Sequence, residues 1–289
     1  MRPIKELFIE EYWNIGFRKF SEDDTVVNAG GVYSFDILKA TDRYWYADPF
    51  LFEEDDRIYL FVEMFDNKTE KGLIGVSEWD GGRFTEPRAV LEEPFHLSYP
   101  YVFEKNGQIY MMPETQQDGC IQLYESTGFP DKWEKRKVLV KINDAVDTVI
   151  IDNYLVTSVI DSAAEKTTHI ELYNAQTGEA YFGNPICQAS SDSRGAGRPF
   201  NLNGRVIRPA QDCSGGIYGR GLYFYDVTIG NGSYTERKIS HLDFSSVKTK
   251  GLNPTGIHTY ARCRDIEIVD IKSERFNPRR LLWILSKKI

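Results

Sequence analysis

The chain has 289 residues, with 43 acidic against 35 basic side chains and a formal net charge of −8. Its composition, 41% hydrophobic and 27% charged, is that of a globular protein, which excludes disordered, collagen-like and disulfide-scaffold classes. The acidic balance argues against a sequence-independent nucleic-acid binder, because neutralising phosphates requires a surplus of Lys and Arg.

Short runs rich in Val, Ile, Tyr and Phe alternate with clusters of Gly, Asn, Asp and Pro, which predicts many short strands. The first hairpin is DPFLFEEDDRIYLFVEMF, with its turn at residues 54–57. The next is PYVFEKNGQIYMMPE, where Asn106-Gly107 is a strong turn signal. DTVIIDNYLVTSV follows with Asp152-Asn153 at its tip, and PFNLNGRVIRPA with Asn203-Gly204. The sequence therefore predicts an all-β protein.

These hairpins are copies of one unit. They start at Asp48, Tyr99, Asp147 and Arg198, which are 51, 48 and 51 residues apart. Each copy continues with a third strand (LIGVSEW, CIQLYES, HIELYNA, GLYFYDV) and a weaker fourth one. A period near 50 residues with four strands per copy is typical of a β-propeller blade.

A fifth, shorter copy starts near His258 and continues with DIEIVDIK and RRLLWILSKK. We expect the N-terminal segment FIEEYWNIGFRKF to join this copy and close the ring, which removes a free sheet edge. The prediction is one domain over residues 1–289, a five-bladed β-propeller. Its blades are expected at about residues 45–92, 96–140, 144–189, 197–242 and 256–289, the last completed by residues 8–35.

Charged residues occur at the same phase of several repeats, where apolar strands begin or end. Because strand starts of neighbouring blades meet at one mouth of a propeller channel, we expect these side chains to gather there. The starts carry Asp48, Tyr99, Asp147, Arg198 and His258, and the ends of the second strands carry Glu63, Glu114, Asp161, Gln211 and Asp212. Such a ring is either a ligand site or a set of ion pairs that hold the blades together. Pro49 is expected to restrict Asp48 to an extended backbone.

A family resemblance rests on WYADPFLFEEDDRIYLFVEMFD, HLSYPYVFEKNGQIYMMPE, AVDT, GRPF and RPAQDCS. Over roughly residues 8–289 the chain resembles a bacterial family of five-bladed propellers, and this module is similar to the N-terminal domain of plant glucosamine inositolphosphorylceramide transferases. More distantly, Ala47-Asp48-Pro49 resembles the strand start of family 43 and family 32 glycoside hydrolases.

The family 43 resemblance implies three catalytic positions. Asp48 matches the general base, Tyr99 stands where that family has a second acid, and Asp147 is the nearest match to its general acid Glu. Glu114 is an alternative acid, since a carboxyl that follows Met111-Met112-Pro113 in apolar surroundings is expected to have a raised pKa. The predicted catalytic residues are therefore Asp48, Glu114 and Asp147.

Arginines are expected at the same mouth, where they either neutralise the acids or bind a diphosphate leaving group through bidentate hydrogen bonds. The predicted substrate-binding residues are Glu63, His96, Tyr99, Arg198, Arg208, Gln211, Asp212 and His258. We expect a glycosyltransferase of surface-polysaccharide biosynthesis that binds a sugar or nucleotide-sugar donor. Two alternatives stay open: a family 43 type of glycoside hydrolase, and a non-catalytic glycan-binding or scaffold propeller that partners a separate glycosyltransferase.

The sequence contains few signals for a cofactor or for a cellular location. The family 43 resemblance allows a structural calcium ion near His258, but calcium prefers oxygen ligands, so a hydrogen-bonded histidine is favoured and no metal site is predicted. No apolar run reaches the roughly 18 residues of a membrane span. Acids near the start argue against a signal peptide, and the four cysteines show no metal-ligand spacing. We therefore expect a cytoplasmic protein with reduced thiols.

Overall fold

The computed structural model describes residues 8–28, 30–181, 183–230 and 233–277. Within these ranges the chain forms strands and short 3-10 segments without an α-helix, which confirms the all-β prediction. None of the described helical segments is long and apolar enough to cross a membrane. The strand expected over residues 279–288 lies outside the described ranges.

The strands form five sheets, which are named here from first to fifth. The first comprises β3 (Tyr44–Glu54), β4 (Arg57–Asp66), β5 (Lys71–Glu78) and β6 (Arg88–Leu91). The second comprises β7 (Ser98–Lys105), β8 (Gln108–Glu114), β9 (Cys120–Gly128) and β10 (Lys132–Lys141). The third comprises β11 (Ala145–Ile151), β12 (Tyr154–Ser162) and β13 (Thr167–Asn174). The fourth comprises β14 (Phe200–Leu202), β15 (Arg205–Asp212), β16 (Gly221–Gly230) and β17 (Ser233–Asp243).

The fifth sheet combines both ends of the described chain. Its strand order is β18-β2-β1-β20-β19. These strands are β1 (Ile9–Lys19), β2 (Tyr33–Leu38), β18 (Val247–Thr249), β19 (Tyr260–Cys263) and β20 (Ile266–Phe276). β1 pairs with β20 antiparallel along its whole length, from Ile9 opposite Phe276 to Lys19 opposite Ile266. The expected pairing of the N-terminal segment with the last repeat is thus present.

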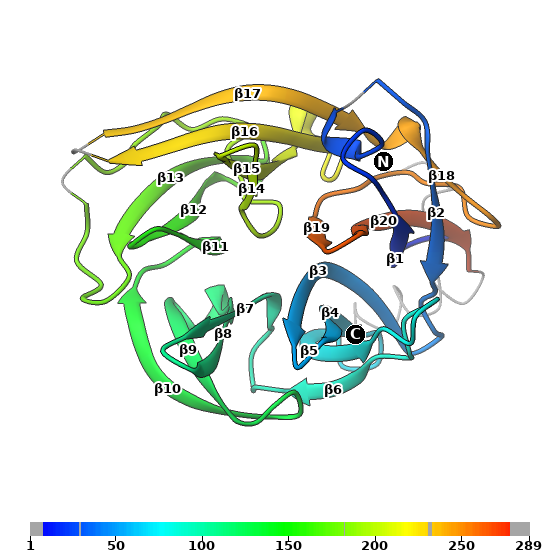
Figure 1. Cartoon of the computed structure of the whole chain (residues 1–289), viewed down its shortest axis with the longest axis horizontal. Helices are drawn as coiled ribbons and strands as arrows, with labels where there is room; N and C mark the ends of the chain where they lie inside the picture. Colours follow the sequence, from blue (N-terminus) through cyan, green and yellow to red (C-terminus); the bar gives the residue numbers. More distant parts are fainter. Residues whose placement is uncertain (1–7, 29, 182, 231–232, 278–289) are drawn as a thin grey trace.

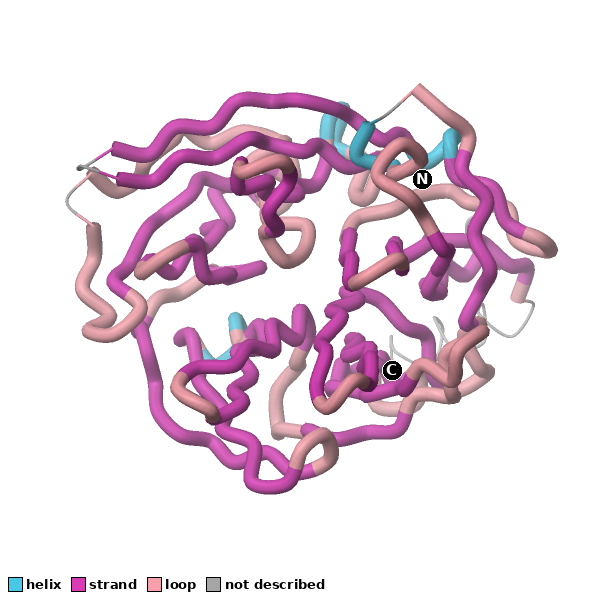
Figure 2. Tube along the Cα trace, viewed as in Figure 1, coloured by secondary structure: helices cyan, strands magenta, loops and turns pink. Residues whose placement is uncertain are grey.

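The sheets are arranged around a common centre, with β3, β7, β11, β14 and β19 nearest to it (Figure 1). Strands make up most of the trace, and loops and turns of different lengths join them (Figure 2). The apolar residues of the inner strands are buried between the sheets, and Phe50, Phe61 and Tyr99 have no exposed surface. Burying side chains of this size is worth roughly 1.5–3 kcal/mol each, so packing between sheets holds the arrangement together.

The strand starts share an unusual backbone. Asp48, Tyr99 and Asp147 have φ angles of 49°, 48° and 52°, and each lies in a break in the register of its first hairpin. The extended geometry expected for Asp48 before Pro49 is therefore wrong. The bulge turns each of these residues out of the ladder into the left-handed region, which costs on the order of 1–3 kcal/mol and is typical of functional sites.

Candidate functional site

Acidic, basic and aromatic side chains meet where the inner strands begin. We call the following residues the carboxylate cluster: Asp48, Glu63, His96, Glu114, Asp147, Arg194, His258 and Asp270. The cluster consists of three groups, and the members of each group are in direct contact. The groups also influence one another, because the charge of Asp48 in the first group raises the pKa of Glu63 in the second and of Glu114 and Asp147 in the third. The structure therefore brings together residues from the first, second, third and fifth sheets and from the loop before the fourth.

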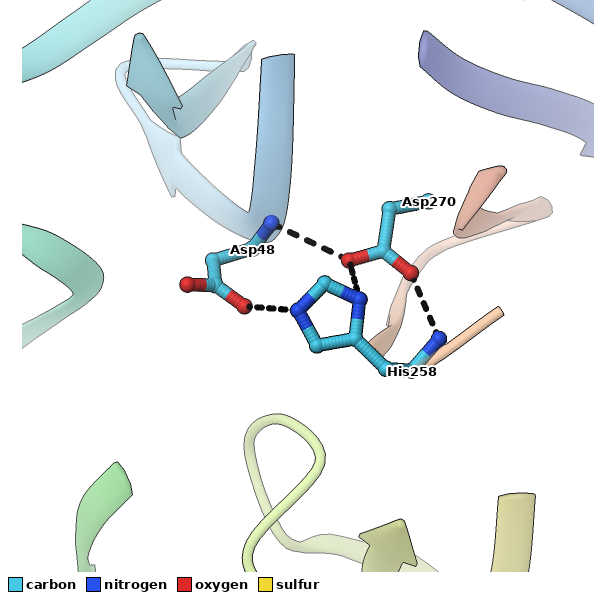
Figure 3. Close-up of side chains that lie close together, drawn as sticks. All are labelled: Asp48, His258 and Asp270. Carbon is cyan, nitrogen blue, oxygen red and sulfur yellow. Dashed lines mark hydrogen bonds and ion pairs between the residues drawn. The ribbon is translucent and has the colours of Figure 1, made fainter. Parts of the chain in front are cut away.

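The first group is a histidine held between two aspartates (Figure 3). His258 Nε2 lies 3.2 Å from Asp48 Oδ1, and His258 Nδ1 lies 2.8 Å from Asp270 Oδ2. Asp48 also accepts hydrogen bonds from the Thr259 hydroxyl (2.8 Å) and the Tyr99 backbone N–H (3.2 Å). All three members of the group are buried.

The surroundings favour the protonated form of this histidine. Burial alone would lower its pKa, but Asp270 and Asp48 raise the pKa of His258 to about 10. The ring centroid lies 4.2 Å from that of Trp13 and 5.0 Å from that of Tyr218, so the charge faces two aromatic rings. Burial would likewise raise the pKa of Asp48, yet His258 and Thr259 hold it below its usual value. Asp48 is therefore an anion paired with an imidazolium.

Asp48, His258 and Asp270 have side chains that can bind a metal ion. One possible ligand atom of each lies within 4.8 Å of the other two. The Asp270 oxygens, however, already accept the backbone N–H groups of Asp48, His258 and Thr259, at 2.8–3.2 Å. Both ring nitrogens of His258 face carboxylates. Calcium requires six to eight oxygen ligands, so this donor set does not fit the calcium ion considered near His258.

The second group pairs Glu63, in β4, with His96. His96 Nε2 lies 3.2 Å from Glu63 Oε1, while His96 Nδ1 accepts the backbone N–H of Gly72 at 3.0 Å. The Gly72 hydrogen bond requires an unprotonated Nδ1, so the proton lies on Nε2 and points at Glu63. Both ring nitrogens are thus engaged, and His96 has none left to carry a proton to a ligand.

The third group contains Glu114, Asp147 and Arg194. Arg194 Nε donates to Asp147 Oδ2 at 2.5 Å, and Arg194 Nη2 lies 3.9 Å from Glu114 Oε2. Burial and the neighbouring charge of Asp147 raise the pKa of Glu114 to about 8, although Arg194 opposes the shift. Burial also raises the pKa of Asp147. Glu114 therefore exchanges its proton near neutral pH.

The other predicted site residues divide into two sets. Gln211 is fully buried and its Nε2 lies 3.0 Å from the Gly195 carbonyl and 3.5 Å from Asp147 Oδ2, which places it beside the cluster. The Tyr99 hydroxyl accepts the backbone N–H of Gly197 at 2.6 Å. Tyr99 therefore supports the loop that carries Arg194, and its backbone N–H holds Asp48.

Three predicted residues lie outside the contacts of the cluster. Arg208 is buried and bonds Glu236 through Nε and Nη2, at 3.1 and 2.7 Å. Arg198 donates to the Val102 carbonyl and lies over the Tyr101 ring. Asp212 is 2.9 Å from His241 Nε2. These contacts join strands or sheets, so the structure does not bring the two arginines to the acids.

Sequence reasoning missed Asp270, Arg194, Trp13 and Tyr218. An acid within the apolar run DIEIVDIK was the available signal for Asp270. Arg194 lies four residues before the arginine that repeat spacing selected, in a loop that follows no repeat. Trp13 and Tyr218 reach the cluster only through tertiary packing, which no local pattern records.

Comparison with known proteins places this site in a family. The family model described as "Glucosamine inositolphosphorylceramide transferase 1, N-terminal" matches residues 37–276. The chain belongs to this family. The match includes every member of the carboxylate cluster.

Curated relatives of the chain carry the name glucosamine inositolphosphorylceramide transferase 1. The Arabidopsis thaliana protein is 36% identical over 187 residues, which is 60% of this chain and 24% of the relative. The Oryza sativa subsp. japonica protein is 36% identical over 199 residues, 63% of this chain and 26% of the relative. The chain thus aligns with about a quarter of the length of the relatives that it matches.

Two solved structures with a similar fold are glycoside hydrolases. The catalytic domain of a Coprinopsis cinerea GH62 α-L-arabinofuranosidase has a TM-score of 0.54 at 11% identity, over 87% of this chain and 85% of that chain. A Bombyx mori GH32 β-fructofuranosidase has a TM-score of 0.51 at 10% identity, over 78% of this chain and 57% of that one. At these identities the likeness concerns the fold alone.

Proposed function

We propose that this chain catalyses glycosyl transfer from an activated sugar donor at the carboxylate cluster. The observation that carries the proposal is Glu114, a carboxyl with a pKa of about 8 held beside Asp147 and Arg194, in a chain whose relatives are named transferases. A group that gains and loses a proton near neutral pH is suited to general acid–base chemistry.

In the proposed reaction, an acceptor hydroxyl attacks the anomeric carbon of the donor sugar. The new bond joins the acceptor oxygen to that carbon, while the bond from the carbon to the phosphate oxygen breaks and its electron pair leaves with the phosphate. Ionised Glu114 takes the hydroxyl proton. Asp48 is the weaker base, because its pKa is lowered and its oxygens already accept hydrogen bonds from Thr259 and Tyr99. Its negative charge instead stabilises positive charge that develops on the sugar.

We further propose that the five sheets form a closed five-bladed ring. The support is that β3 contacts β7 on one side and β1 and β19 on the other. The pairing of β1 with β20 would then complete the last blade with residues from the start of the chain. Such a ring would hold the cluster residues of different blades at fixed separations.

One observation favours a second candidate, a glycan-binding module that serves a separate transferase. The chain aligns with only 24–26% of the length of its plant relatives, so the remainder of those proteins has room for the transfer chemistry. In this case the cluster would bind a sugar without turnover.

A panel of nucleotide sugars, first in a thermal-shift assay and then with acceptor present, tests the proposal. Transfer predicts stabilisation by a nucleotide sugar and formation of a glycosylated acceptor, and a ligand at 100 times its Kd adds about 2.7 kcal/mol. Stabilisation by free oligosaccharide without product supports the binding module. Release of free sugar from an oligosaccharide identifies a hydrolase and contradicts the proposal.

A further inference from the structure

A small cavity adjoins the carboxylate cluster at Arg194. Its volume is about 150 Å³, and Arg194 and Tyr218 form part of its wall together with Ser162, Lys166 and Thr167. Ser162 ends β12 and Thr167 begins β13, so the cavity lies beside the turn that joins these strands. Arg194 therefore faces two places, the acids on one side and this cavity on the other.

The carboxylate cluster and the cavity differ in the charges of their side chains. The cluster contains five carboxylates, whereas no Asp or Glu is among the described residues that line the cavity. Arg194 and Lys166 both line it, and Lys166 has no ion pair within the described part of the chain. Hydroxyl groups of Ser162 and Thr167 add hydrogen-bond donors. The rest of the wall includes the apolar residues Ile160 and Ala163. Two cations and hydroxyl groups without an acid make the polar part of this cavity suited to an anion.

Arg194 has donors to spare for such an anion. Its Nε bonds Asp147, and Nη2 approaches Glu114 only to 3.9 Å. A guanidinium carries five N–H donors in a planar fork. The Tyr218 ring lies 5.4 Å from the guanidinium carbon, and Lys272 Nζ holds the Tyr218 carbonyl at 3.0 Å. Arg194 is thus fixed by Asp147 and Tyr218 while its Nη groups remain available.

The volume limits what enters. A water molecule occupies about 30 Å³ in the liquid, and ligand pockets usually measure about 300–1,000 Å³. The cavity therefore accommodates one chemical group of a larger ligand. We propose that it is a phosphate subsite, in which Arg194 and Lys166 bind a phosphoryl group of a substrate whose sugar lies in the carboxylate cluster. This inference rests on the proposed function and specifies the substrate class as a phosphorylated one.

A phosphoryl group reaches this subsite from one of two sources, a nucleotide sugar donor or an inositol phosphate acceptor. Equilibrium binding of UDP, myo-inositol 1-phosphate and inorganic phosphate distinguishes them without any turnover. The variants are Lys166→Ala and Lys166→Glu, with Lys39→Ala as the control, because Lys39 is exposed and has no ion pair within the described residues.

The subsite predicts that Lys166→Ala weakens binding of at least one of the two organic phosphates by about tenfold, as expected for a lost charge-assisted contact, and that Lys166→Glu weakens it further. The probe that responds identifies the source. Lys39→Ala should bind as the wild type does. If the wild type binds neither organic phosphate, or if binding is independent of Lys166, the subsite is wrong. A phosphate response in a protein without transfer activity would instead retain the subsite and contradict the proposed function.

Discussion

At the scale of single residues, charge in this molecule is concentrated where apolar strands begin. An unpaired buried charge costs several kcal/mol, yet Asp48, Asp147 and Asp270 are all buried. Asp48 and Asp270 are both compensated by His258, and Asp147 is compensated by Arg194. The contact with His258 also lowers the pKa of Asp48, and the contact with Arg194 opposes the burial that raises the pKa of Asp147.

His258 is the cation on which the first group depends. Its pKa of about 10 lies above the ordinary 6.5, so its stabilising contribution is fully present below pH 6.5 and is lost as the pH rises through about 10. His258→Gln leaves two buried aspartates without a cation, which should cost about 3–5 kcal/mol near pH 7. Melting temperatures measured from pH 6 to pH 10 should show a large deficit that shrinks at alkaline pH. His169→Gln, outside the cluster, is the control, and an equal deficit at every pH would contradict the charge assignment.

Ionisation of Glu114 also lowers the stability of the fold as the pH rises, but over a lower pH range than deprotonation of His258. Its pKa is raised from 4.5 to about 8, so the unfolded chain loses this proton at lower pH than the folded protein does. The fold therefore loses stability as the pH rises from about 4.5 to 8, by an amount on the order of a few kcal/mol. Glu114→Gln removes this loss and should melt at a higher temperature than the wild type at pH 8 but not at pH 5. Glu134→Gln, an exposed position, should change neither value.

At the scale of elements, the position of His96 depends on a glycine, Gly72, in β5. A Cβ at Gly72 would lie 2.4 Å from the Leu97 carbonyl oxygen, 2.7 Å from His96 Cε1 and 2.9 Å from Glu63 Oε1. Gly72→Ala should therefore displace His96 and lower the free energy of unfolding by about 1–3 kcal/mol. Urea denaturation measures this change. Gly82→Ala is the matched control, because a Cβ there meets nothing within 4 Å, and an equal effect of both variants would contradict the steric account.

β1 is the element that joins the two ends of the described chain. Ile15, near the middle of β1, has no exposed surface and packs with Leu60 and Ile268 in one apolar cluster. Ile15→Ala should cost about 2–5 kcal/mol, since it leaves a cavity between the first and fifth sheets. Glu11→Ala, at an exposed position of the same strand, should have little effect in the same denaturation experiment. A small cost for Ile15→Ala would show that β1 contributes little to the fold.

Local features were the most predictable from the sequence. The Asn-Gly hairpin turns are present, with positive φ angles at Asn106, Gly107, Asn203 and Gly204. The first, second and fourth repeats each form four strands, as the 50-residue period indicated. The third sheet has three strands instead of the expected four. The fifth sheet contains β2 and β18, which the repeat pattern did not predict as strands of that sheet. Such pairings depend on packing between distant segments rather than on local pattern.

At the scale of the whole molecule, the repeat brings one polar position per sheet to a common region, which is why Asp48, Glu114 and Asp147 could be selected together. Arg198 was selected on the same argument, but it turns to Val102 and Tyr101. The arginine that contacts the acids is Arg194. It lies in the loop before β14, whose position in the sequence does not match the repeat. Repeat spacing therefore identified the acids of the site, but it selected Arg198 instead of Arg194 as the cation beside them.

The most direct test of the account is the initial rate of sugar transfer by Glu114→Gln, measured beside its melting temperature and with Glu134→Gln as control. Gln retains the size of Glu114 and removes its ability to accept a proton. The account predicts a rate lower by about 10²–10⁴, with the fold intact and the control unaffected. Transfer at the wild-type rate by a folded Glu114→Gln protein would contradict the assignment of proton transfer to this carboxyl.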